Sequence, residues 1–143
     1  MPTSKQHSGV ALLLFLFLLA GCGAPSDRVP VYPAGGTLTH QGQPAVGAIV
    51  ILHPTDPAAA PVKPRGKVGT DGSYRLTTYD TGDGAPAGEY VVTVYWPKQP
   101  KAGDPVTDDG PDILAGKYLR LEQPAARVAV TSGDNRLDPI TLK

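Results

Sequence analysis

Residues 68–97 read VGTDGSYRLTTYDTGDGAPAGEYVVTVYWP, and this stretch decides the fold that the sequence predicts. Asp71-Gly72 separates two runs rich in β-forming residues, which is a strong short-range signal for a hairpin. We expect a type I′ turn at this pair, with positive φ at both residues. A glycine-rich corner then leads into a longer strand that ends at Pro97.

Apolar side chains alternate with polar ones along both strands of this stretch. Because successive side chains of a strand point to opposite faces, Tyr74 and Leu76 share one face of the first strand. One face of the second strand carries Tyr90, Val92, Val94 and Trp96. Two neighbouring strands with one apolar face each require a second sheet packed over that face.

Four further strand candidates flank this stretch, at residues 34–40, 46–53, 127–131 and 136–142. Pro139 predicts an edge strand or a bulge in the last of them, because proline cannot donate to a sheet ladder. About seven short strands with turn signals between them predict an all-β sandwich. The expected core consists of the inward positions Leu38, Val50, Leu52, Tyr74, Leu76, Tyr90, Val92, Val94, Trp96, Val128, Val130 and Ile140.

The N-terminus has the pattern of a secretory signal. Lys5 and His7 precede an unbroken apolar run over residues 10–20, which is too short to span a bilayer. The run ends in Leu19-Ala20-Gly21-Cys22, which resembles the bacterial lipobox and contains the only cysteine of the chain. The resemblance implies cleavage before Cys22 and attachment of diacylglycerol (palmitate-type chains) to its sulfur.

This interpretation divides the chain into three parts. Residues 1–21 are the lipoprotein signal peptide, 22–33 a flexible proline-containing tether, and 34–143 the folded domain. Two or more acyl chains hold a protein stably at a membrane. We therefore expect a membrane-anchored lipoprotein of the bacterial cell envelope. Gly23 favours the outer membrane, because by analogy an aspartate at this position favours retention at the inner one.

The turn and core residues together resemble the carboxypeptidase regulatory-like domain, in the form found in small lipoproteins of planctomycete-type bacteria. The matching segments are Gly36-Thr-Leu-Thr39, Gln41-Gly-Gln-Pro44, Gly47-Ala-Ile-Val50 with Pro54, Gly69-Thr-Asp-Gly72 with Tyr74 and Leu76, Gly88-Glu-Tyr-Val91 and Ser132-Gly-Asp-Asn135. The resemblance implies a seven-stranded Greek-key β-sandwich of the transthyretin (prealbumin) type with an accessory or interaction role. It supplies no catalytic residues.

Catalytic and metal-binding patterns are missing from the sequence. Neither His40 nor His53 has carboxylates at a helpful spacing, and the EF-hand pattern fails around Gly84. An irregular calcium site using Asp80, Asp83 and Glu89 stays open. No serine is placed for a triad, and 13 basic against 13 acidic residues give no sign of nucleic-acid binding. We expect no enzyme, no cofactor and no resident metal.

The candidate contact residues lie at the end of the long strand and in the loop that follows it. Tyr95 points away from the predicted core, and an exposed aromatic ring can stack on a sugar or anchor a protein partner. The loop over residues 98–116 is either functional or mobile, and it contains Asp104, Asp108, Asp109 and Asp112. These carboxylates could bind calcium, contact a basic partner or simply be solvated.

Two functions agree with these observations. The first is a non-enzymatic, lipid-anchored envelope domain with a structural or protein–protein interaction role. The alternative is a carbohydrate- or ligand-binding module at the envelope surface, which would use Tyr95 or the acidic loop. Both functions involve the membrane through Cys22, and an envelope protein or a glycan as partner.

Overall fold

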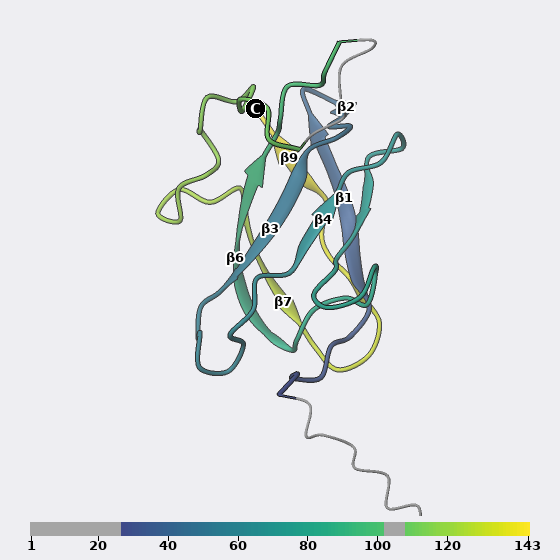
Figure 1. Cartoon of the computed structure of the whole chain (residues 1–143), viewed down its shortest axis with the longest axis vertical. Helices are drawn as coiled ribbons and strands as arrows, with labels where there is room; N and C mark the ends of the chain where they lie inside the picture. The colour runs from purple at the N-terminus through teal and green to yellow at the C-terminus, as the bar shows by residue number, and fades with distance from the viewer. Residues whose placement is uncertain (1–26, 102–107) are drawn as a thin grey trace, which may run out of the picture.

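The computed structural model describes residues 27–101 and 108–143, and every regular element in these two ranges is a β-strand. The strands are β1 Ala34–His40, β2 Gln43–Pro44, β3 Ile49–Pro54, β4 Arg65–Lys67, β5 Ser73–Arg75, β6 Gly88–Tyr95, β7 Ala126–Val130, β8 Asn135–Arg136 and β9 Ile140–Leu142. They form two sheets (Figure 1), so the all-β prediction is confirmed and the arrangement is consistent with a β-sandwich. The predicted signal peptide, Cys22 and Asp104 lie outside the described residues.

One sheet has four strands in the order β4-β3-β6-β7, all antiparallel. Its centre is the pairing of β3 with β6, which runs from Ile49 opposite Tyr95 to Pro54 opposite Tyr90. Val50 and Leu52 on β3, and Val92 and Val94 on β6, are fully buried. β-branched and aromatic residues fit such a pleated surface well, which explains the long regular ladder.

The second sheet is built around β1. β2 and β5 pair with β1 in antiparallel orientation, whereas β8 and β9 run parallel to it. Ala34 lies opposite Asn135 but Leu38 lies opposite Ile140, so one extra residue is accommodated between β8 and β9. Pro139 lies in this break, and within the described ranges both short strands pair with β1 alone. The predicted edge position and interruption at Pro139 are therefore confirmed.

The turn at Asp71-Gly72 joins the two sheets and is not of the expected type I′. Gly72 is the one residue of the turn with positive φ, at 81°, and its N–H donates to the carbonyl of Gly69. The Asp71 carboxylate accepts hydrogen bonds from the N–H and the hydroxyl of Ser73. This local pairing holds Asp71 in an ordinary conformation, and the left-handed Gly72 completes a three-residue connection. β4 then pairs with β3, and β5 with β1.

One hydrophobic core lies between the sheets and contains all the predicted inward positions. Ten of the twelve are buried, and Trp96 and Val128 are partly buried against the same cluster. The structure adds Val68, Leu137 and Leu142, which lie in or beside the short strands that the sequence places least well. Tyr90 is buried and donates its hydroxyl hydrogen to the carbonyl of Pro86, so its one polar atom is satisfied.

The N-terminal part of the described chain contacts the loop before β6. Arg28 forms an ion pair with Asp80, and its guanidinium lies 4.9 Å from the ring centroid of Tyr79. Tyr32 exchanges backbone hydrogen bonds with Ala85. The C-terminal part of the predicted tether thus packs on the domain. No helix long and apolar enough to cross a membrane occurs in the described parts of the chain.

Candidate ligand-contact face

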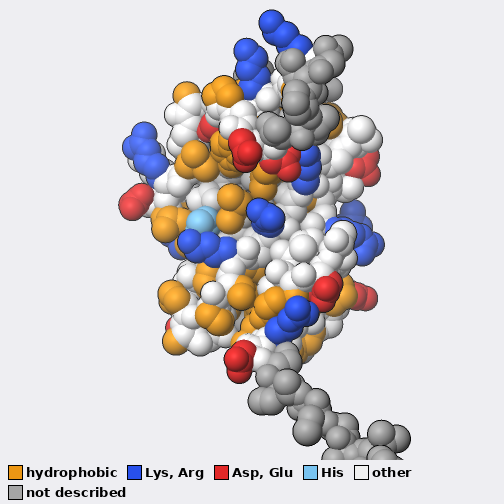
Figure 2. Space-filling model, in the orientation of Figure 1, with side chains coloured by type: hydrophobic (Ala, Val, Ile, Leu, Met, Phe, Trp, Pro, Cys, Tyr) orange, Lys and Arg blue, Asp and Glu red, His pale blue; other side chains and the backbone are white. Residues whose placement is uncertain are grey.

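A cavity of about 760 Å³ lies over the outer face of the four-stranded sheet. Its lining combines apolar, basic and acidic side chains: Ile49, Ile51, Arg65, Gly66, Lys67, Arg75, Thr77, Thr81, Gly82, Tyr95, Asp108 and Asp109. Figure 2 shows hydrophobic and basic side chains intermixed over the side of the molecule that carries β3 and β4 in Figure 1. We call this surface the contact face.

Strand register explains why these side chains meet. Ile49 lies opposite Lys67 on one side and opposite Tyr95 on the other. Directly opposed residues project from the same face of a sheet with their Cβ atoms about 5 Å apart. These three residues therefore form a row across the sheet, in which the Ile49 side chain lies between the Lys67 ammonium group and the Tyr95 phenol ring. In the next row, Ile51 lies between Arg65 on one side and Thr93 on the other.

Three of the four predicted contact residues of the domain line this cavity: Tyr95, Asp108 and Asp109. The Tyr95 hydroxyl donates to the carbonyl of Gly110, which ties the end of β6 to the loop. Asp108 Oδ1 lies 2.5 Å from Lys67 Nζ, and about half of each side chain is exposed. Asp109 is exposed. The fold thus brings an aromatic ring and two carboxylates to one surface, from positions up to 14 residues apart.

Asp112 has a different position and does not line the cavity. Its carboxylate accepts hydrogen bonds from the backbone N–H of Trp96 at 3.0 Å, Leu114 at 3.2 Å and Gly116 at 2.7 Å. Asp112 also pairs with Pro97 through an isolated β-bridge. This carboxylate therefore fixes the C-terminal end of the long loop against β6. Its oxygens are already engaged in hydrogen bonds within the chain.

His53 and Thr93 form a polar pair beside the contact face. The imidazole Nε2 of His53 lies 2.8 Å from the hydroxyl oxygen of Thr93, which is almost fully buried. Burial lowers the pKa of His53, and the nearby Lys63 ammonium lowers the pKa further. The ring is therefore neutral at pH 7 and serves to satisfy the buried Thr93 hydroxyl.

The carboxylates considered for an irregular calcium site do not converge. Asp83 accepts hydrogen bonds from the backbone N–H of Thr78, Tyr79 and Asp80, at 2.7–3.0 Å. Burial raises the pKa of Asp83, but these hydrogen bonds outweigh burial and hold the pKa below its ordinary value. Asp80 pairs instead with Arg28. Across residues 27–101 and 108–143, no group of three or more His, Cys, Asp or Glu side chains could hold a metal ion.

The sequence did not identify the basic residues and isoleucines of the contact face. Arg65 and Lys67 belong to β4, a strand of three residues whose pairing with β3 cannot be read from spacing. The available signal in the sequence was the alternation of residue types at Arg65, Gly66 and Lys67, with a small residue between two basic ones. Ile49 and Ile51 alternate with the predicted inward residues Val50 and Leu52, so the pattern indicates the other face of the strand for them, but it assigns no neighbouring strand.

Searches against protein-family models, characterised proteins and solved structures return no match to this chain.

Proposed function

We propose that this chain is a non-enzymatic, lipid-anchored domain of the bacterial cell envelope that binds another envelope protein through the contact face. The observation that carries the proposal is the cavity in which Ile49, Ile51 and Tyr95 lie between basic and acidic side chains. Protein interfaces combine an apolar centre with aromatic anchors and a charged rim. A partner that inserts an apolar side chain flanked by carboxylates would fit this surface.

In this proposal the fold is the seven-stranded Greek-key sandwich of the carboxypeptidase regulatory-like type. The two sheets with one shared core support it, as do the turns at Gln41-Gly42 and Gly69–Gly72. The fold gives the contact face a rigid support, because β3 and β6 pair continuously beneath it. A rigid surface binds with a smaller loss of conformational entropy than a mobile one.

The proposed anchor determines which end of the domain lies near the lipid. Arg28 contacts the domain through Asp80, so this contact is six residue steps from Cys22, with five residues between them. Six extended residues reach at most roughly 20 Å. The domain would therefore stay close to the membrane surface. In this proposal Gly23 favours the outer membrane. Tyr95 would lie toward the far end, since Figure 1 shows the purple start of the described chain and the end of β6 at opposite ends of the domain.

The proposal is tested by affinity purification from gently solubilised envelopes. We expect the wild-type chain to retain a defined protein partner and Ile51→Asp to lose it, because a carboxylate would replace the apolar centre of the face. Glu122→Lys changes an exposed residue outside the cavity and serves as the control. Equal recovery of the partner by wild type and Ile51→Asp would exclude the contact face as its binding surface.

The anchor is tested separately by fractionation. The wild-type chain should partition with membranes, and Cys22→Ala should appear in the soluble fraction or as an uncleaved precursor. Identical membrane partitioning and identical processing of the two chains would refute lipidation at Cys22. This result is independent of the partner test, because fractionation measures lipidation near the N-terminus rather than binding at the contact face.

A second candidate is a carbohydrate-binding module, because Tyr95 and the carboxylates of Asp108 and Asp109 line the same cavity. Sugar recognition uses ring stacking together with hydrogen bonds from hydroxyls to carboxylates. On a glycan array, retention that Tyr95→Ala weakens at least tenfold would favour this function. Absence of retention on the array would leave the protein–protein proposal as the better one.

A further inference from the structure

β7 is an edge strand of the four-stranded sheet, and its outer side is open. Within the described ranges β7 pairs with β6 alone, from Gly88 opposite Val130 to Val92 opposite Ala126. The edge of a sheet presents unpaired N–H and C=O groups to which a further strand can bind. The hydrogen bonds of β6 show which groups of β7 these are.

The backbone groups of Arg127 and Ala129 point out of this edge. The carbonyl of Glu89 accepts a hydrogen bond from the chain that continues β3, so the backbone groups of Glu89 are directed toward β3. Those of Tyr90, the next residue, are therefore directed toward β7, where Val128 lies opposite. The same alternation along β7 directs the groups of Arg127 and Ala129 away from β6. Among the described residues these groups have no hydrogen-bond partner.

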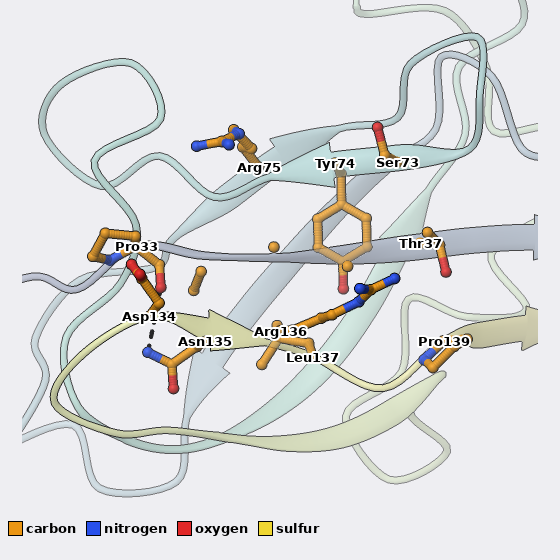
Figure 3. Close-up of a pocket in the computed structure, with 13 residues that line it drawn as sticks. Pro33, Thr37, Ser73, Tyr74, Arg75, Asp134, Asn135, Arg136, Leu137 and Pro139 are labelled. Carbon is orange, nitrogen blue, oxygen red and sulfur yellow. Dashed lines mark hydrogen bonds between the residues drawn. The ribbon is translucent and has the colours of Figure 1, made fainter.

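The open part of the edge ends at Thr131. The N–H of Thr131 donates to the side-chain oxygen of Asn135, and the Asn135 amide donates back to the Thr131 carbonyl, both at 2.9 Å. Figure 3 shows Asn135 among the residues that line a cavity of about 570 Å³ on the sheet around β1, where its amide also donates to the carbonyl of Pro33. The edge therefore offers the backbone groups of Arg127 and Ala129 to a further strand.

Val128 lies between these two residues and is incompletely covered. Its side chain projects to the core face, since Val128 lies opposite the buried Tyr90. Val128 is nevertheless only partly buried, because in the described parts of the chain no strand lies beyond β7. A strand added at this edge would cover the remaining apolar surface of Val128, which is favourable.

We propose that two copies of this chain pair through β7 in antiparallel orientation, about a twofold axis beside Val128. In this register Val128 lies opposite Val128 of the second copy, and Arg127 of each copy lies opposite Ala129 of the other. Each Arg127–Ala129 pair exchanges both of its backbone hydrogen bonds. The two four-stranded sheets then join into one continuous sheet, and the interface is self-complementary as a twofold axis requires.

The residues of the edge select this register over its neighbours. An axis beside Arg127 would set the two copies of Arg127 directly opposite each other, and opposed like charges destabilise a sheet. An axis beside Ala129 would set Arg127 opposite Thr131, whose backbone groups are already bonded to Asn135. The axis beside Val128 avoids both conflicts and sets each arginine opposite a small side chain.

Charge complementarity indicates a second copy as the partner of this edge. Glu89 lies opposite Ala129, and both residues are exposed on the outer face. In the dimer, Arg127 of the second copy lies on the other side of Ala129. Because strands are about 4.8 Å apart, the Cα atoms of Glu89 and that Arg127 are separated by roughly 10 Å, with only the Ala129 methyl group between them. Among the described residues, neither charged side chain has an ion-pair partner within its own chain.

The dimer leaves the contact face open. The residues that line the contact face do not belong to β7. The twofold axis is perpendicular to the joined sheet, so the contact faces of both copies point to the same side. For copies anchored as proposed above, the strands would lie parallel to the lipid surface. The pairing itself does not depend on the anchor.

Cysteine crosslinking tests the register. Each variant is the full chain with Cys22→Ala, held in nonionic detergent and oxidised mildly. Val128→Cys should form a disulfide-linked dimer, because the opposed Cα atoms would be about 4.5 Å apart. Ala129→Cys is the matched control, since position 129 is more exposed but lies opposite Arg127, and its two copies are farther apart than the about 7 Å that a disulfide spans. We expect at least tenfold more dimer from Val128→Cys. Equal or greater crosslinking of Ala129→Cys would overturn the proposal.

Charge exchange tests the contact between Glu89 and Arg127 without cysteines. In sedimentation equilibrium in density-matched detergent, Arg127→Glu should weaken the dimer at least tenfold, and adding Glu89→Arg to the same chain should restore it. Arg120→Glu changes an exposed arginine outside β7 and should dimerise as wild type does. Thermal unfolding of each variant confirms that it is folded. A wild-type chain that stays monomeric, a dimer that Arg127→Glu does not weaken, or one that the double exchange does not restore would overturn the proposal.

Discussion

The two sheets of this domain differ in what their residues allow on the outer face. In the four-stranded sheet, β3 and β6 pair over six residues and present Ile49, Ile51 and Tyr95 outward. In the sheet around β1, Gly35 and Gly36 stand at the centre and the pairings are two or three residues long. Large residues on both faces produce a long ladder and an apolar surface. Glycines permit close backbone approach and leave a bare depression flanked by arginines.

Removing core volume from the regular ladder should have the largest effect. Leu52→Ala should lower the free energy of unfolding by about 2–5 kcal/mol, because Leu52 is fully buried and its removal leaves a cavity. Ile51→Ala, the next residue and an outward one, should cost about 1 kcal/mol or less. Urea unfolding measures both values. Similar losses in the two variants would mean that β3 does not have one buried and one outward face.

Filling the glycine depression should have the next largest effect. Gly35→Ala should destabilise the protein by about 1–3 kcal/mol, because its Cβ would collide with the Tyr74 carbonyl and push β5 away from β1. Gly69→Ala is the matched control, since the nearest atom to its Cβ would be 3.5 Å away, and it should stay within about 0.5 kcal/mol of wild type. Thermal unfolding of both variants decides whether close approach explains Gly35.

The loop between the sheets should give a pH-dependent effect of about 1 kcal/mol. The pKa of Asp83 is depressed in the folded state, so its stabilisation is present above about pH 4 and is lost as pH falls through the folded pKa. The effect is modest because the site is partly solvated. Asp83→Asn should therefore be less stable than wild type at pH 7 and nearly equal at pH 2.5. A constant difference across this range would contradict the role assigned to the charge.

The ion pair at the contact face should give the smallest effect. Lys67 and Asp108 are about half exposed, and such pairs contribute about 0–1 kcal/mol. A double-mutant cycle with Lys67→Met and Asp108→Asn should give a coupling energy in this range at low salt and close to zero in 1 M sodium chloride. Coupling that persists at high salt would show that the pair is more enclosed than its exposure indicates.

The sequence predicted most of the regular sheet because its signals are local. Alternation placed Tyr90, Val92 and Val94 on one face, and all three are buried. The strand at residues 34–40 has the predicted bounds, and Pro139 interrupts the last run as expected from its missing donor. Each of these features depends on a few neighbouring residues, so spacing and residue type are sufficient to find it.

Other features depend on contacts between distant segments. Asp71-Gly72 marks a turn, but its type follows from the hydrogen bonds of Asp71 with Ser73, which hold Asp71 away from positive φ. Tyr95, Asp108 and Asp109 were identified by residue type, yet only the pairing of β3 with β4 adds Arg65 and Lys67 to the same face. Arg75 and Arg136 lie on either side of Gly35 through an antiparallel pairing with β5 and a parallel pairing with β8, and no local pattern indicates either pairing.

Site-specific photo-crosslinking in intact envelopes tests the central proposal most directly. A photoreactive phenylalanine analogue is placed at Tyr95 on the contact face, and in a second chain at the exposed Glu122, outside the cavity. We predict that the Tyr95 position forms a discrete crosslinked product with one envelope protein, while the Glu122 position does not. No product from the Tyr95 position, or the same product from both, would contradict a binding function for this face.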